Sequence, residues 1–171
     1  MRYFAGEVDP GSEDLRLALE KFRRVGDRTM EAWTLHMLGG AYIRLGRLDE
    51  ARRLLQEAVR HFHAASDTAG VTLTLDDLSS LALAEGREAD AGRLGGAARN
   101  LASTTGATLA SIVDDAIEFE ARPNVRRALA PDLLNSLARE GAAMTLDEAV
   151  AFGLGVPVED VRAGAVEAGA E

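Results

Sequence analysis

The sequence contains no cysteine, which excludes a disulfide framework and any cysteine-ligated metal site. This absence is typical of a reducing compartment, and we expect a cytoplasmic location. Aromatic residues are also scarce, at 5%, although hydrophobic residues make up 47% of the 171 residues. The core must therefore consist mainly of leucine, alanine and valine, and side chains of this size favour closely packed helices.

Long apolar runs and a basic-then-apolar leader are also missing. A membrane-spanning helix needs about 20 consecutive apolar residues, so we predict neither a membrane span nor a signal peptide. Acidic residues outnumber basic ones by 28 to 19, which gives a net charge of −9. Binding to a nucleic-acid backbone normally requires a clustered basic surface, and direct nucleic-acid binding is therefore not expected.

Recognisable catalytic patterns are absent as well. The sequence has no GxxxxGKS/T phosphate-binding loop, and the glycine-rich stretch GRLGGAA at 92–98 follows no predicted strand. No serine or threonine has a base near it in a detectable motif. We therefore predict a protein that is not an enzyme and that holds no cofactor.

What the sequence does contain is an internal repeat. Gly26-Asp27 is followed by RTMEAWTLHMLGGAYIRLG, and Ser66-Asp67 is followed by TAGVTLTLDDLSSLALAEG. This offset of about 40 residues lies in the range typical of stacked helical repeats. The positions that match across it are Leu35 and Leu75, Leu38 and Leu78, Gly46 and Gly86, Ala51 and Ala91, and Ala58 and Ala98.

Each repeat reads as two helices joined at a glycine. One apolar stripe has helical spacing over Leu35, Leu38, Tyr42 and Leu45, and a second stripe runs from Leu48 through Ala51, Leu55 and Ala58 to Phe62. Gly46 lies between the stripes, where glycine allows a left-handed turn that ends the first helix. Gly39, Ala51 and Ala58 are small enough for the paired helices to approach closely.

Leu38, Gly39, Tyr42, Gly46, Ala51 and Ala58 together resemble the tetratricopeptide repeat, in its long-period variant. The best copy covers roughly 32–65 and a weaker copy roughly 72–105, while only the second helix of an earlier copy remains at 12–25. The resemblance implies an all-α solenoid of antiparallel helix pairs with a C-terminal helical cap. It also implies a non-enzymatic protein–protein interaction module.

The C-terminal part carries a second resemblance. The stretches AGRLGGAARNLASTTGATL (91–109) and AREGAAMTLDEAVAFGL (138–154) resemble the helical-repeat tails of bacterial LuxR/AfsR-like regulators and of signalling ATPases or nucleotide cyclases. This implies a part, or a relative, of a signalling or transcriptional regulator. Pro131 suits the first turn of a helix, and Thr145 and Glu148 have capping-box spacing.

The chain divides into four predicted segments. Residues 1–27 form an N-terminal arm and the second helix of a partial repeat, with Ser12 as the expected N-cap. Residues 28–107 form two helix pairs, and 108–154 form capping helices. Residues 155–171 form an acidic, mobile tail with one frayed turn around Glu159–Val166.

The predicted partner site is a concave groove. In tetratricopeptide repeats the stripe beside the buried one lines this groove, and an apolar floor with mixed charge suits an extended peptide or a helix. A small-molecule or peptide sensor that binds its ligand in the same groove is the alternative. The groove residues are Trp33, His36, Met37, Gly40, Arg44, Leu73, Asp76, Asp77 and Ser80.

The N-terminal half repeat suggests a second contact. Its apolar stripe has no preceding helix to pack against, and solenoids usually need polar caps. We therefore predict a homodimer, or a contact with another domain, through Tyr3, Phe4, Leu15, Leu19 and Phe22.

The remaining polar clusters favour plainer interpretations. His61 and His63 point to different helix faces, so we predict exposed helix-end histidines and no metal site. Trp33 and His36 share one face, either as ligand contacts or as a half-buried packing pair. Asp114, Asp115, Glu118 and Glu120 are interpreted as a solvated helix face, and Arg52, Arg53 and Arg60 as salt-bridged outer residues.

Overall fold

The computed structural model describes residues 8–105 and 128–168, and every regular element in these two ranges is a helix. This confirms the predicted all-α fold. The helices are α1 (Val8–Val25), α2 (Arg28–Arg44), α3 (Leu48–Ala64), α4 (Thr68–Ala84), α5 (Glu88–Thr105), α8 (Pro131–Ala142), α9 (Leu146–Leu154) and α10 (Val158–Ala168).

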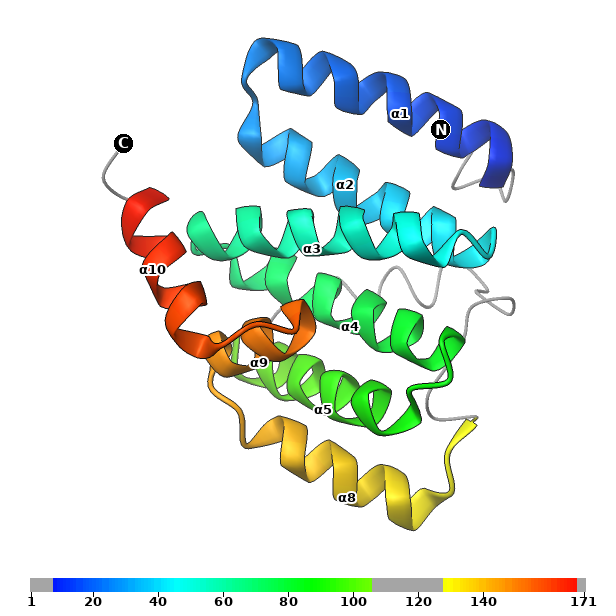
Figure 1. Cartoon of the computed structure of the whole chain (residues 1–171), viewed down its shortest axis with the longest axis vertical. Helices are drawn as coiled ribbons and strands as arrows, with labels where there is room; N and C mark the ends of the chain where they lie inside the picture. The colour runs from blue at the N-terminus through cyan, green and yellow to red at the C-terminus, as the bar shows by residue number, and fades with distance from the viewer. Residues whose placement is uncertain (1–7, 106–127, 169–171) are drawn as a thin grey trace.

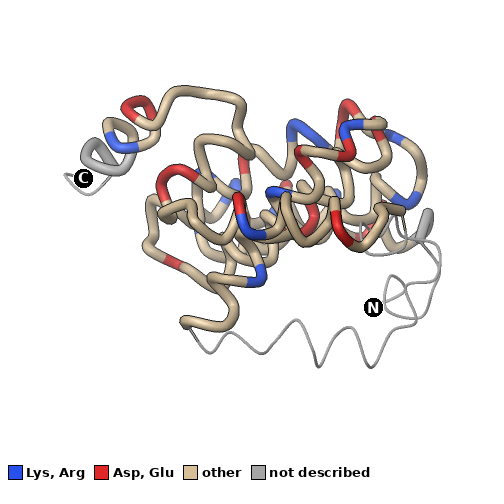
Figure 2. Tube along the Cα trace, turned by 90° about the horizontal axis from the view of Figure 1, so that it is seen from below, with Lys and Arg blue, Asp and Glu red and all other residues tan. Residues whose placement is uncertain are grey.

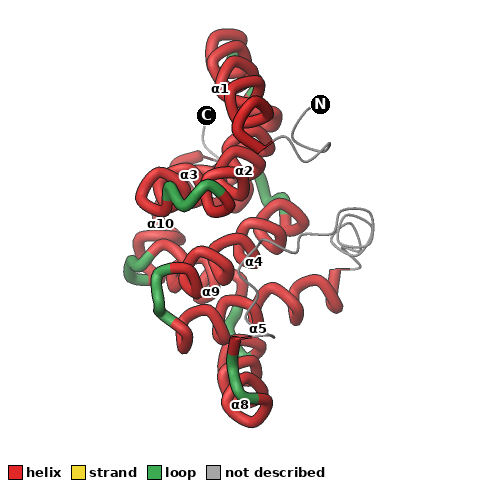
Figure 3. The backbone as a smooth tube through the Cα atoms, turned by 90° about the vertical axis from the view of Figure 1, so that its right-hand side faces the viewer, coloured by secondary structure: helices red, strands yellow, loops and turns green. Residues whose placement is uncertain are grey.

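The helices form a stack with α1 at one end and α8 at the other (Figures 1 and 3). Consecutive helices from α1 to α5 pack against each other, with the most extensive contacts within the pairs α2–α3 and α4–α5. The second pair repeats the helix bounds of the first at the offset predicted from the sequence. Helices α9 and α10 lie on one side of the stack and contact α3.

The turns between consecutive helices from α1 to α5 are spaced along the sequence by half of the repeat offset. Gly26, Gly46 and Gly86 have positive φ angles of 72°, 71° and 76°, and Ser66 takes the same role with a φ of 54°. The next residue closes each turn; for example, the Arg47 N–H donates to the Tyr42 carbonyl at 2.9 Å. A left-handed residue followed by such a bond satisfies carbonyls that the helix end would leave unpaired. The predicted function of Gly46 is therefore confirmed.

The core lies along the seam of each helix pair. Leu35, Leu38 and Tyr42 of α2 are buried, and so are Ala51, Leu55, Ala58 and Phe62 of α3, while Leu48 is partly buried. A Cβ on Gly39 would lie 2.6 Å from Leu55 Cγ, so this helix pair packs closer than any larger residue allows. The close packing predicted for Gly39 is confirmed.

Helix α1 differs from its prediction. It begins at Val8, so Ser12 lies inside the helix, where it is buried, and is not the N-cap. Proline is tolerated within a first turn because the N–H groups there have no intrahelical partner, and the helix therefore continues upstream through Pro10. Leu15 and Leu19 are buried within the single chain. Tyr3 and Phe4 lie outside the described residues.

Helix α8 packs on α5 with unusually close contact. A Cβ on Gly96 would lie 2.3 Å from the Ala138 carbonyl oxygen, and one on Gly141 would lie 1.9 Å from the Arg93 carbonyl oxygen. A Cβ on Gly92 would lie 2.7 Å from Leu137 Cβ, so this contact is close as well. Mid-helix glycines cost about 1 kcal/mol each in helix propensity, and here they permit backbone contact between helices.

The C-terminal helices contain confirmed and corrected predictions. Pro131 occupies the first turn of α8, and Thr145 and Glu148 form the predicted capping box at the start of α9. The expected single frayed turn is instead an eleven-residue helix, α10, because Val161 becomes buried in the core when α10 packs on α9 and α3. The predicted acidic face at Asp114–Glu120 lies outside the described residues.

Candidate interaction surfaces

One line of partly exposed side chains runs along α2 and continues on α4. Both helices are buried on most of their faces because each packs against several neighbours. Trp33 and His36 of α2 correspond, at the repeat offset, to Leu73 and Asp76 of α4. We call this line the α2–α4 stripe; it comprises Trp33, His36, Met37, Arg44 and Leu73, which are partly exposed, and Asp76, which is exposed.

Three of the predicted groove residues do not share this exposure. Gly40, Asp77 and Ser80 are buried, since their positions turn toward neighbouring helices. Six of the nine predicted residues therefore lie at least partly at the surface, and the other three are buried.

His36 joins the two repeats. Its Nε2 lies 3.0 Å from Oδ2 of Asp77, a carboxylate whose side chain is only 6% exposed. Trp33 meets the edge of the His36 ring at 6.0 Å and packs on Phe62 of α3 at 4.9 Å. Nδ1 of His36 is buried without a hydrogen-bond partner. Trp33 and His36 thus do form a half-buried packing pair, and both remain partly exposed.

The two helix-end histidines point to different neighbours, as predicted. His63 Nε2 lies 2.9 Å from Asp147 Oδ1 of α9, and its side chain is 10% exposed. The interpretation of His63 as an exposed residue is therefore wrong, because α9 covers this end of α3. Asp147 also accepts a hydrogen bond from Arg162 of α10 at 3.1 Å. The hydrogen bonds from His63 and Arg162 lower the pKa of Asp147.

His61 belongs to the only cluster in the described ranges whose spacing suits a metal ion, with Glu31 and Glu57. The guanidinium of Arg23 already bridges both carboxylates, at 2.9 Å from Glu31 and 2.6 Å from Glu57. A cation at this position would have to displace Arg23. The cluster therefore acts as an ion-pair network that ties α1 to α2 and α3.

Glu31 is the most buried acid of this network, with a side chain 4% exposed. Burial raises its pKa, but the hydrogen bond from Arg23 and the charges of His61, Arg23 and Arg28 outweigh burial and lower it. A buried carboxylate stays charged only when it is paired in this way. No feature of the sequence had marked Glu31, because an acid in a first helical turn is ordinarily exposed.

The arginines of α3 are engaged differently from one another. Arg52 pairs with Glu85, Arg60 donates to a carbonyl of its own helix, and Arg53 is exposed. Figure 2 shows basic and acidic positions interleaved along the described helices. None of these helices is long and apolar enough to cross a membrane.

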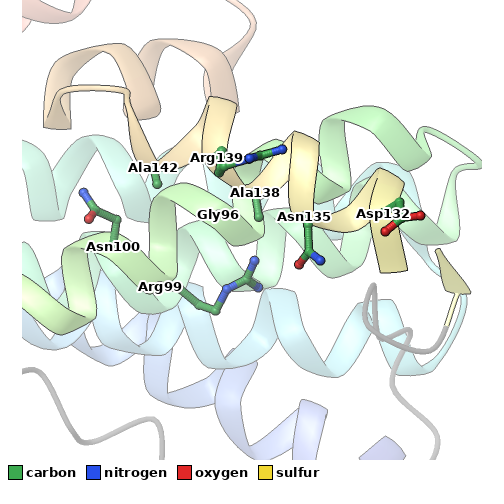
Figure 4. A pocket seen from close by; sticks show the side chains of 8 residues that line it. All are labelled: Gly96, Arg99, Asn100, Asp132, Asn135, Ala138, Arg139 and Ala142. Carbon is green, nitrogen blue, oxygen red and sulfur yellow. The ribbon is translucent and has the colours of Figure 1, made fainter. Parts of the chain in front are cut away.

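A second surface lies where α8 crosses α5 (Figure 4). This open groove has a volume of about 710 Å³, and we call it the α5–α8 groove. Its lining residues are Gly96, Arg99, Asn100, Asp132, Asn135, Ala138, Arg139 and Ala142. The glycines in GRLGGAA and AREGAA were the only feature of the sequence that indicated close helix packing here. The sequence did not indicate which helix packs on these glycines to form the groove.

A smaller cavity of about 270 Å³ lies between α3, α9 and α10. Its lining is largely apolar, with Val150, Val156 and Val161 beside Arg60 and His63. Ligand pockets usually measure about 300–1,000 Å³, so this space is small for a ligand.

Comparison with known proteins adds one finding. Residues 3–64, which include α1, α2 and α3, match the tetratricopeptide repeat family. The second pair, α4–α5, lies outside the matched residues. No curated protein and no solved structure matches the chain, and neither comparison therefore bears on the resemblance to LuxR/AfsR-like regulators. Residues 3–64 are therefore similar to the tetratricopeptide repeat family, and the stacked helix pairs of the described residues are consistent with its solenoid fold.

Proposed function

We propose that this protein is a non-catalytic interaction module that binds a protein or peptide along the α2–α4 stripe. Tetratricopeptide repeats generally mediate protein–protein interaction. The observation that supports the proposal is a repeated exposure: Trp33 and His36 of α2, and their equivalents Leu73 and Asp76 of α4, remain accessible on two packed helices that are otherwise mostly buried. Such a continuous line can be followed by one extended partner.

The chemistry of the stripe suits a partner that is partly apolar. Trp33, Met37 and Leu73 supply apolar surface, and tryptophan is among the residues that contribute most to binding at interfaces. Arg44 of α2 and Asp76 of α4 add charges of opposite sign. An amphipathic helix or an extended peptide with apolar anchors fits this arrangement.

The experiment starts from peptides selected on the immobilised protein by phage display. Their affinity is then measured from the fluorescence of Trp33, the only tryptophan in the sequence, and by polarisation of labelled peptide. We expect Arg44→Glu and Met37→Asp to weaken binding at least about tenfold, or 1.4 kcal/mol. Arg53→Glu, an exposed arginine on α3, is the matched control. Unchanged affinity in both stripe variants would defeat the proposal.

The regulatory context is a finer proposal. It is supported only by the resemblance of residues 91–109 and 138–154 to regulator tails. The adjoining reading frame in the genome tests it. A neighbouring DNA-binding, ATPase or cyclase domain would support a regulator, and a neighbour of unrelated kind would count against one.

A homodimer through α1 also stays a proposal. Leu15 and Leu19 are buried within one chain, and Phe22 is partly buried, so they contribute little to a second contact. The exposed large apolar residues of α1 are Leu17 and Val25, at 50% and 72%. Sedimentation equilibrium tests the dimer, and a monomer at high protein concentration would exclude it.

The sensor alternative has weaker support. It places a small ligand in the groove beside His36, whose Nδ1 lacks a partner but is buried. The more enclosed of the two cavities described above lies elsewhere, between α3, α9 and α10. Thermal-shift screening with metabolites distinguishes the two functions, because a ligand that binds the folded state raises the melting temperature.

A further inference from the structure

The outer face of α1 presents a line of exposed side chains at one end of the stack. Figures 1 and 3 show α1 at this end, with α2 on its inner side. Four exposed residues, spaced by three, four and three positions, share the outer side of the helix. We call them the α1 outer stripe, and they are Asp14, Leu17, Lys21 and Arg24.

The charged groups of this stripe have no partner among the described residues. No side-chain hydrogen bond or ion pair in the part of the chain that the structure describes engages Asp14, Lys21 or Arg24. Their neighbours differ, because Glu13 and Arg16 pair with each other at 2.8 Å and Arg23 is held by the network on α2 and α3. The three charges of the stripe are therefore available to another molecule.

The order of residues along the stripe places an apolar side chain between opposite charges. Asp14 precedes Leu17, and the two bases follow it. An acid early in a helix and bases late in it also favour the helix dipole, so the charges serve α1 by itself as well. Leu17, at 50% exposure, has no such role. An apolar residue flanked by charges is the arrangement of a protein contact, which has an apolar centre and a polar rim.

This order makes the stripe complementary to itself. If two α1 helices lie antiparallel, with the two-fold axis between Leu17 and Lys21, Asp14 of each copy lies opposite Arg24 of the other. Leu17 then lies against the aliphatic part of Lys21 of the second copy. A parallel pair would instead set like charges beside each other. A two-fold dimer uses the same surface on both copies, and the α1 outer stripe meets this condition.

We propose that two copies of this chain associate through the α1 outer stripe, as an antiparallel pair of α1 helices in which Asp14 of each copy pairs with Arg24 of the other. This proposal rests on the homodimer proposed above and assigns its surface. It replaces the predicted contact through Leu15 and Leu19, which are buried within one chain. It does not depend on peptide binding along the α2–α4 stripe.

The test is sedimentation equilibrium of the full chain at several protein concentrations, in low and in high salt. We expect a monomer–dimer equilibrium that weakens as salt rises, because salt screens charge pairs. Asp14→Arg and Arg24→Asp should each raise the dissociation constant of the dimer at least about tenfold, and so should Leu17→Asp. The double variant Asp14→Arg with Arg24→Asp exchanges the two charges of every pair, and it should recover the association of the wild type.

Matched controls separate the contact from general charge repulsion, which matters in a chain with a net charge of −9. Arg53→Asp on α3 and Glu88→Arg on α5 reverse exposed residues and change the net charge as much as the two single stripe variants do. Both controls should leave the dissociation constant unchanged. Circular dichroism on each variant checks that the helices remain folded.

The outcomes separate this interface from the two functions proposed above. A dimer that the single stripe variants leave unchanged would overturn this interface but keep the homodimer. Monomers at every concentration in low salt would overturn both, and a double variant that fails to recover association would overturn the antiparallel pairing. Met37→Asp on the α2–α4 stripe should leave the dimer unchanged, so a failure of peptide binding is measured independently of it.

Discussion

Gly46 and Ser66 hold the same left-handed backbone at successive turns, with φ angles of 71° and 54°. Both are followed by a residue whose N–H closes the turn onto the preceding helix, at 2.9 Å for Arg47 and 2.8 Å for Asp67. The turn is therefore set by backbone geometry that recurs along the stack, and serine occupies one position where its neighbours in the series are glycine.

This relationship predicts that Ser66→Gly stabilises the protein. A left-handed conformation costs a residue with a Cβ about 1–2 kcal/mol, and glycine removes this cost but adds about 0.4–1 kcal/mol of unfolded-state entropy. We expect a net gain of about 0.5 kcal/mol in the free energy of unfolding, measured by urea denaturation. The reverse change, Gly46→Ser, should destabilise. A loss of stability in Ser66→Gly would contradict the argument.

The α5–α8 crossing predicts a strong effect at Gly141. A Cβ there would lie 1.9 Å from the Arg93 carbonyl oxygen and 2.9 Å from the Ala97 nitrogen, so Gly141→Ala must push two backbones apart. We expect the free energy of unfolding to fall by about 2–3 kcal/mol. Gly164→Ala on α10 is the control, because nothing lies within 4 Å of its Cβ. That substitution should be neutral or slightly stabilising. A similar loss of unfolding free energy in both variants would argue against the close contact between α5 and α8 at Gly141.

Asp147 gives a prediction on acid sensitivity. Its hydrogen bonds from His63 and Arg162 hold its pKa below the ordinary value of about 3.9. A lowered carboxyl pKa adds stability that is fully present above the ordinary pKa and is lost as pH falls through the folded-state pKa. Asp147→Asn should therefore cost about 1 kcal/mol at pH 7, since the pair is partly exposed, and progressively less below about pH 4.

The measurement is the difference in unfolding free energy between wild type and Asp147→Asn across pH 2–7. Asp160→Asn, at an exposed acid on α10, should show a small difference with little dependence on pH. A difference for Asp147→Asn that grows as pH falls below about 4 would have the wrong sign for this interaction.

Substitution of Arg23 should lower the free energy of unfolding, because it leaves the buried Glu31 carboxylate poorly paired. Glu31 would retain only Arg28, at 3.4 Å, as a close cationic partner among the described arginines. We expect Arg23→Ala to lower stability by about 2 kcal/mol, which is less than a fully buried pair costs because Arg23 is itself half exposed. Arg24→Ala, at an exposed neighbour, should cost little. Adding Glu31→Gln to Arg23→Ala should recover part of the loss, and no recovery would argue against the pairing.

The same network predicts how the protein responds to zinc. In the wild type Arg23 lies between Glu31 and Glu57, so added Zn²⁺ should leave the melting temperature unchanged. In Arg23→Ala the two carboxylates and His61 become free to bind, and Zn²⁺ should raise the melting temperature. Differential scanning fluorimetry with and without a chelator measures both. Zinc stabilisation of the wild type would show that a cation displaces Arg23.

The local sequence pattern was sufficient to predict the architecture. Regular spacing of Leu35, Leu38 and Tyr42, and its recurrence in the next repeat, predicted the helix pairs, because burial of an apolar stripe depends on local periodicity. Gly46, Pro131 and Thr145 predicted helix ends correctly, since turn and cap preferences arise from a few neighbouring residues. The prediction that Ser12 is an N-cap was wrong, because one amphipathic pattern is compatible with several positions for the first residue of the helix.

Tertiary structure decided which polar residues act together. Asp77 reaches His36 and Asp147 reaches His63 across helices that are distant in sequence, and Glu31 reaches Arg23 across the turn between α1 and α2. Nothing in the local pattern encodes these pairs, because they depend on how far each helix shifts and rotates against its neighbours. The α5–α8 groove arises in the same way: its glycines are visible in the sequence, but the helix that packs on them could be identified only from the folded chain.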